Sequence, residues 1–86
     1  MDDENILLNL EELVEKLTLE LRYEKGDFVG GLYRYNNKEQ IIINKDLNTK
    51  QKINVLANEL KVKVNIENLY LVPALREVIE HASSLA

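Results

Sequence analysis

Two side chains in the second half of the chain, Glu59 and His81, are of types that carry acid–base chemistry. Glu59 lies within an apolar helical repeat, where a glutamate acts as a base only if a metal ion or a second acid works with it. His81 is the chain's only histidine, and Glu77 lies four residues before it, as in an ordinary pair on a helix surface. The chain has no cysteine, which excludes thiolate metal ligands. We therefore expect no enzyme activity, no cofactor and no metal.

A second group of residues has the character of a binding surface. It consists of Tyr33, Arg34, Tyr35 and Lys38. Alternation along a strand places both tyrosines on one face, and aromatic rings beside basic groups can stack nucleic-acid bases. Tyrosine and arginine also carry much of the binding energy at protein interfaces, while tyrosines on a sheet commonly pack under a helix. Packing, protein binding and nucleic-acid binding all remain open, and a binding role requires that Tyr33 or Tyr35 be at least partly exposed.

Composition places these residues in an ordinary globular chain. A length of 86 residues with 45% hydrophobic and 30% charged residues predicts a single domain, residues 1–86, with one modest core. The net charge is −4, so attraction to phosphates would be weak and nucleic acid is disfavoured as a partner. No apolar run approaches the roughly 20 residues that span a membrane, and the start MDDENILLNL is too acidic for a signal peptide. We expect a cytoplasmic protein.

The elements that must position these groups follow from the spacing of apolar residues. Residues recurring three and four positions apart predict a first, amphipathic helix, with the stripe Ile6, Leu7, Leu10, Leu13, Val14 and Leu17. From residue 18 the period changes to two, which predicts a strand up to residue 24, and further strands follow at 28–35 and 40–44. Residues 25–27 and the pair Asn36 and Asn37 supply the turns. We expect a three-stranded antiparallel meander, in which Gly30 and Gly31 mark a bulge or the close approach of another backbone.

The third strand and the helix after it give the clearest structural signal. Residues 41–43 are three consecutive isoleucines, whose β-branched side chains predict a strand buried on both faces. Asn48 and Gln51 have the spacing of a capping box, which predicts the start of a helix. The apolar stripe of that helix should pack on the strand, and it comprises Ile53, Leu56, Ala57, Leu60 and Val64.

The chain after this helix is less regular. Residues 61–65 fit either the end of the helix or a short strand, with the helix end preferred, and residues 65–72 form a connector. Pro73 suits the first position of a last helix, because a proline has no N–H to leave unpaired there. The apolar stripe of that helix is Leu75, Val78, Ile79 and Ala82. The predicted fold class is α+β: a helix, the three-stranded antiparallel meander, and two helices packed on one face of the sheet.

The sequence IIIN at residues 41–44 leads into VLANEL at residues 55–60. This order resembles the core of small zinc metallopeptidases of the ImmA/IrrE type (zincins), in which a strand reading I-x-I-N is followed by a helix reading L-A-H-E-L-x-H. Asn58 and Val62 stand where the two zinc-binding histidines of that family would be. Neither an amide nor an isopropyl group replaces an imidazole. The resemblance implies a degenerate relative, a metallopeptidase-like scaffold without metal.

Two functional hypotheses follow. The first is a non-catalytic protein-interaction or regulatory module, which binds an unknown protein or associates with itself. The alternative is a small nucleic-acid-binding module that uses the hairpin of residues 33–38. A salt titration separates the two, because a contact with phosphates weakens steeply with salt whereas an apolar protein contact does not.

Overall fold

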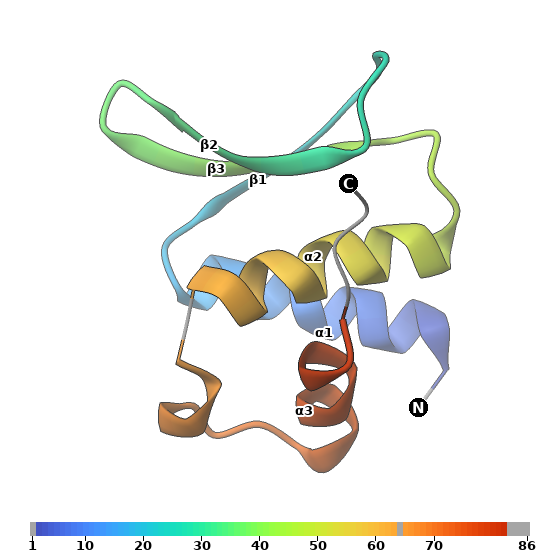
Figure 1. The fold of residues 1–86 in the computed structure, drawn as a ribbon, viewed down its shortest axis with the longest axis vertical. Helices are drawn as coiled ribbons and strands as arrows, with labels where there is room; N and C mark the ends of the chain where they lie inside the picture. Colours follow the sequence, from blue (N-terminus) through green and yellow to red (C-terminus); the bar gives the residue numbers. More distant parts are fainter. Residues whose placement is uncertain (1, 64, 83–86) are drawn as a thin grey trace.

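The computed structural model describes residues 2–63 and 65–82, apart from the side chains of Tyr35 and Ile66. The elements follow the order α1 (Asp3–Lys16), β1 (Glu20–Glu24), β2 (Gly30–Tyr35), β3 (Lys38–Asn44), α2 (Thr49–Lys63), the 3-10 helix η1 (Ile66–Asn68) and α3 (Pro73–Glu80). Figure 1 shows three layers: the sheet, then α1 and α2 side by side, then α3 on the far side of that helix pair. The predicted α+β class and the order of one helix, three strands and further helices are confirmed.

The sheet has the strand order β1-β3-β2, so the strand with three isoleucines lies in its centre. β1 runs parallel to β3 and β2 runs antiparallel to it, so that Leu21 and Leu32 flank Ile41 from opposite sides. The predicted antiparallel meander is therefore wrong, because β1 pairs with β3 and not with β2. The physical reason is burial: Ile41 and Ile43 are almost fully buried, and a central strand has its main chain covered along both edges as well. A meander would have left this strand at an edge.

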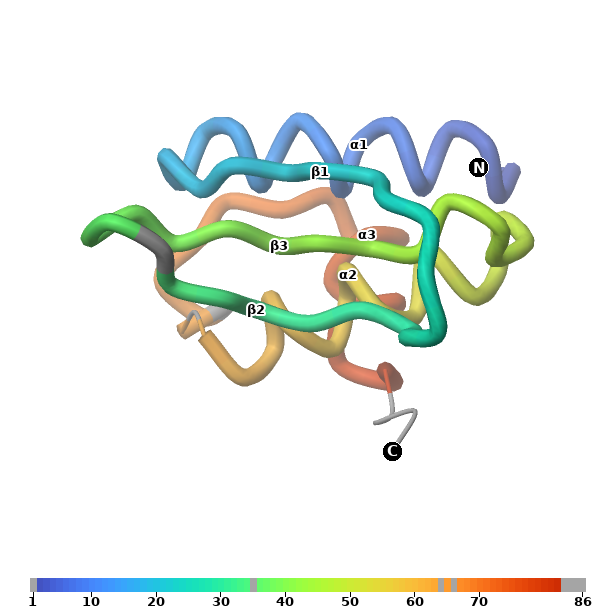
Figure 2. The backbone as a smooth tube through the Cα atoms, turned by 90° about the horizontal axis from the view of Figure 1, so that it is seen from above, coloured from blue at the N-terminus to red at the C-terminus, as the bar shows by residue number. Residues whose placement is uncertain are grey.

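The segment that follows β1 in the chain crosses the end of β3 and then enters β2 (Figure 2). Asn44, the last residue of β3, holds the crossing in place: its side-chain amide donates to the carbonyl oxygens of Gly26 and Phe28, each at 2.8 Å. The return from β2 to β3 is the predicted tight turn. Asn36 and Asn37 have φ angles of 51° and 63°, as a two-residue hairpin turn of type I′ requires.

The core lies between the sheet and the helix pair. α2 begins at the predicted capping box, since the N–H of Gln51 donates to Asn48 Oδ1 at 2.8 Å and the N–H of Asn48 donates to Gln51 Oε1 at 2.9 Å. α1 contributes the fully buried Leu10 and Val14. The predicted stripe of α2 is confirmed except at Val64, which lies outside the described residues; the buried side chains of this helix are Ile53, Val55, Leu56, Ala57 and Leu60.

The third helix does not occupy its predicted place. α3 starts at Pro73 as expected and buries Leu75 and Ile79, but it packs on α2 and α1 and not on the sheet. The pair of helices on the sheet is α1 and α2. Three strands about 4.8 Å apart are covered by about two helices of about 10 Å diameter, so a third helix has to form a separate layer. The preferred interpretation of residues 61–65 is confirmed as far as Lys63, where α2 ends.

Candidate functional site

The helices lie on one side of the sheet, and the opposite face is open (Figure 1). Tyr33 stands on this open face and is 48% exposed. Its ring lines a shallow hollow of about 230 Å³ together with Ile42 of β3, Phe28 of the crossing segment and Glu24. The floor of the hollow is apolar, because Ile42, the middle isoleucine of β3, turns its side chain away from the helices. The prediction that at least one of the two tyrosines is partly exposed is therefore confirmed for Tyr33.

The structure does not bring the predicted cluster onto one surface. Tyr33 and Lys38 are on the open face, whereas Arg34 alternates to the helix side, where it pairs with Glu39. The side chain of Tyr35 lies outside the described residues. The open face therefore presents a partly exposed ring and a lysine, and the arginine belongs to a different group of residues.

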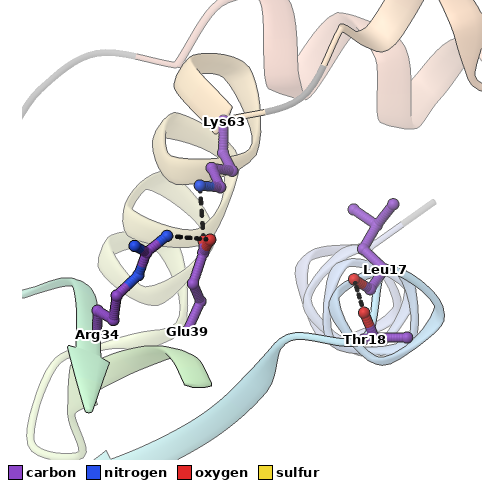
Figure 3. Close-up of polar contacts among 5 residues, drawn as sticks. All are labelled: Leu17, Thr18, Arg34, Glu39 and Lys63. Carbon is purple, nitrogen blue, oxygen red and sulfur yellow. Dashed lines mark hydrogen bonds and ion pairs between the residues drawn. The ribbon is translucent and has the colours of Figure 1, made fainter. Parts of the chain in front are cut away.

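Both basic groups of the predicted cluster have acidic partners. Arg34 Nη2 lies 3.2 Å from Glu39 Oε1, and Lys38 Nζ lies 3.7 Å from Glu20 Oε1. Glu39 also faces Lys63 at the end of α2, at 2.7 Å, and Figure 3 shows its carboxylate between the two cations. Hydrogen bonds from Lys63 and then from Arg34 hold the pKa of Glu39 below its usual range. The positive charge of this surface is thus largely matched by neighbouring carboxylates.

A larger hollow of about 510 Å³ lies at the end of the sheet where β1 begins. Its charged lining consists of Glu20, Lys38, Glu39 and Lys63, two acids and two bases. Thr18 completes it, and its hydroxyl donates to the carbonyl oxygen of Leu17 at 2.6 Å (Figure 3). No local pattern predicts this hollow, because its lining comes from three separate segments: the parallel β1–β3 pair brings residues 17–20 close to residues 37–39, and the end of α2 adds Lys63.

Thr18 occupies an unusual backbone position beside this hollow. α1 ends in a Schellman motif, in which the N–H of Leu19 donates to the Val14 oxygen at 3.2 Å and the N–H of Thr18 to the Glu15 oxygen at 3.0 Å. The residue at the turning point of this motif is usually glycine, and here it is Thr18 with a φ of 59°. A β-branched residue in the left-handed region is strained by about 1–2 kcal/mol.

The residues that carry the metallopeptidase resemblance lie on α2. Glu59 is partly buried, and this burial raises the pKa of its carboxyl. Asn58 is partly buried, while Val62, one turn further on, is 77% exposed. His81 is exposed just after the end of α3. Within residues 2–63 and 65–82 there is no group of three or more histidine, aspartate and glutamate side chains placed to hold a metal ion.

None of the helices in the described part of the chain has the length and apolar character needed to cross a membrane. Comparisons of the chain with protein-family models, with curated proteins and with solved structures found no match.

Proposed function

We propose that this chain is a non-catalytic protein-interaction module of the cytoplasm, which binds a protein partner or a second copy of itself through the open face of its sheet. The observation that supports the proposal best is the exposure of Tyr33 beside the apolar hollow that it forms with Phe28 and Ile42. Tyrosine is enriched among the residues that dominate interface energies, because its ring supplies contact area and its hydroxyl a polar tip. The core itself does not require this ring, since it is turned to solvent.

A nucleic-acid-binding role finds less support. A surface that binds phosphates gains affinity by releasing the counterions that phosphates hold, and it needs unpaired cations to do so. Arg34 and Lys38, the two cations of the predicted cluster, face Glu39 and Glu20 respectively. Titration with single-stranded DNA at low and high salt tests this alternative, because phosphate-driven binding at two cations would weaken several-fold between about 50 and about 200 mM salt.

The scaffold is proposed to be metallopeptidase-like and to lack metal. Support comes from the strand ending at Asn44, the capped helix that follows it, and Glu59 at the position of the family's catalytic glutamate. Asn58 and Val62 carry no imidazole, so the helix offers no pair of zinc ligands. On this proposal a peptidase framework would serve for binding only, and its glutamate would have no metal-bound water to act on.

Replacement of the exposed ring tests the binding role directly. Tyr33→Ala removes the 48% exposed ring from the open face, and Tyr70→Ala is a matched control because Tyr70 is 98% exposed in the connector before α3. Tagged wild-type and variant chains would be cross-linked in their native cells, and the attached proteins identified by mass spectrometry. We expect the cross-linked species to be lost in Tyr33→Ala and retained in Tyr70→Ala, with both melting temperatures close to that of the wild type. An unchanged set of cross-linked species, or unfolding of Tyr33→Ala, would refute the assignment.

A further inference from the structure

The outer edge of β2 carries main-chain groups that have no strand to pair with in the described part of the chain. Figure 2 shows β2 at the margin of the sheet, on the side away from α1. The N–H of Asn44 donates to the carbonyl oxygen of Val29 at 3.0 Å, which fixes the alternation of the antiparallel pair: residues 31, 33 and 35 turn their N–H and C=O groups toward β3. Those of Gly30, Leu32 and Arg34 consequently point outward, away from β3, as the groups of an edge strand do.

The sequence of β2 is complementary to itself when two copies run antiparallel. With Leu32 of each copy opposite Leu32 of the other, Gly31 faces Tyr33 and Gly30 faces Arg34 of the second copy. The smallest residues then lie opposite the largest ones on both faces of the pair. Residue 30 of one copy then pairs with residue 34 of the other, residue 32 with residue 32, and residue 34 with residue 30. Each pair can exchange two main-chain hydrogen bonds, which makes about six in all.

The two glycines of β2 differ in whether their own fold needs them. A Cβ atom on Gly30 would lie 2.8 Å from the carbonyl oxygen of Ile42 and 3.0 Å from Val55 Cγ1, so the approach of β3 and α2 requires a glycine there. A Cβ atom on Gly31 would meet nothing nearer than the ring of Tyr33, at 3.8 Å, which is ordinary contact. A glycine inside a strand costs about 0.5–1 kcal/mol relative to alanine. The single chain therefore does not need this glycine, and the space above it, next to the chain's own Tyr33 ring, is where a side chain of a second molecule would lie.

We propose that two copies of this chain pair along their β2 edges around a two-fold axis at Leu32, which joins their two three-stranded sheets into one. This inference rests on the proposed binding role of the surface around Tyr33. The helices of both copies lie on the same side of the joined sheet, and the two open faces become continuous. Each Tyr33 ring covers Gly31 of the partner, and the two rings occupy diagonal positions across the axis, where aromatic side chains reach one another. Glycines opposite aromatic side chains are a known device for stabilising a strand edge.

An edge of six residues buries less surface than a permanent dimer needs, so the dissociation constant should lie in the micromolar range. Sedimentation velocity of the full chain from about 5 to about 500 µM covers that range. The test variants are Gly31→Val, whose Cβ the single chain accommodates but which obstructs the partner's ring, and Arg34→Pro, which removes an outward N–H together with the exposed ion pair between Arg34 and Glu39. The control is Arg22→Val. It places the same valine side chain on the open face of β1, at the opposite edge of the sheet.

The proposal expects a wild-type dimer whose dissociation constant rises by at least about tenfold in Gly31→Val and in Arg34→Pro and stays within about twofold in Arg22→Val. Amide exchange gives a second measurement: the N–H groups of Leu32 and Arg34 should exchange at least about tenfold more slowly in the concentrated dimer. A chain that stays monomeric up to the highest concentration overturns this pairing but leaves the binding of a different protein at Tyr33 intact. A dimer that survives both test variants also overturns it, because the contact then lies on another surface.

Discussion

Leu56 has the central position in the core, and its truncation gives the most direct test of the fold. The side chain is 0% exposed and lies on the face of α2 that packs against α1 and the sheet. Leu56→Ala removes three carbon atoms from a site with no access to solvent, so the change combines lost burial with a cavity and should cost about 2–5 kcal/mol. A chain of this length has a total stability of roughly 4–13 kcal/mol, so the variant loses a large part of it.

Urea unfolding followed by far-UV circular dichroism measures this loss. With a slope of about 1–3 kcal/mol per molar urea, the midpoint should fall by about 0.7–5 M, and the melting temperature by roughly 8–40 °C. Val62→Ala is the matched control on the same helix, since Val62 is 77% exposed and its truncation should cost less than about 0.5 kcal/mol. A loss below about 1 kcal/mol for Leu56→Ala, or similar losses for the two variants, would show that α2 faces the core with a different side.

Further predictions concern three sites of substitution and the absence of bound zinc. Gly30→Ala should destabilise the chain by about 1–3 kcal/mol, because its Cβ would lie 2.8 Å from the Ile42 oxygen, whereas Gly31→Ala should stabilise it by about 0.5–1 kcal/mol; a lower urea midpoint for Gly31→Ala would contradict this. Thr18→Gly should stabilise the chain by about 0.5–1 kcal/mol by relieving the left-handed strain, and a lower urea midpoint would contradict this. Burial raises the pKa of Glu59 in the folded chain above its ordinary value. Stability should therefore fall as the pH rises from the ordinary pKa to the raised one, because the unfolded chain releases this proton first. Glu59→Gln should raise the melting temperature at about pH 7 and have no effect at about pH 3. Elemental analysis after dialysis should find no stoichiometric zinc, and about one zinc ion per chain would refute the metal-free proposal.

The elements could be predicted from the sequence because their signals are local. The capping box at Asn48, the stripe around Leu56 and the proline at position 73 each depend on residues within a few turns of one helix. The hairpin turn at Asn36 is local in the same sense, since two asparagines in succession tolerate positive φ. Such patterns fix where an element starts, where it ends and which of its faces is buried.

The pairing of the strands could not be predicted in the same way. A turn at residues 25–27 is compatible with a hairpin and also with a crossing over the end of another strand, because both need polar and small residues. The distinction depends on Asn44, whose amide holds the crossing segment from 18 residues away. One signal was present in the sequence, because three consecutive isoleucines favour a well-covered strand, and a central strand has both main-chain edges paired. The predicted burial on both faces is wrong, however, since Ile42 is only partly buried on the open face. The β2–β3 hairpin that carries Tyr33 and Ile42 is the same in both arrangements. The observed pairing adds β1 beside β3, which brings Glu20 close to Lys38 at the end of the sheet.

The parallel pair of β1 and β3 also has a consequence for the order in which the chain folds. β2 and β3 are joined by two residues, so this hairpin forms by closing a short loop. β1 can dock only after β3 has formed, and its contact between Leu21 and Ile41 spans 20 residues of chain. We therefore expect mutations in the hairpin to slow folding and mutations in β1 mainly to speed unfolding. A chain that opens β1 alone would expose the isoleucines of β3 along one edge while the other edge stays paired, and this partly open form is the one in which aggregation would begin.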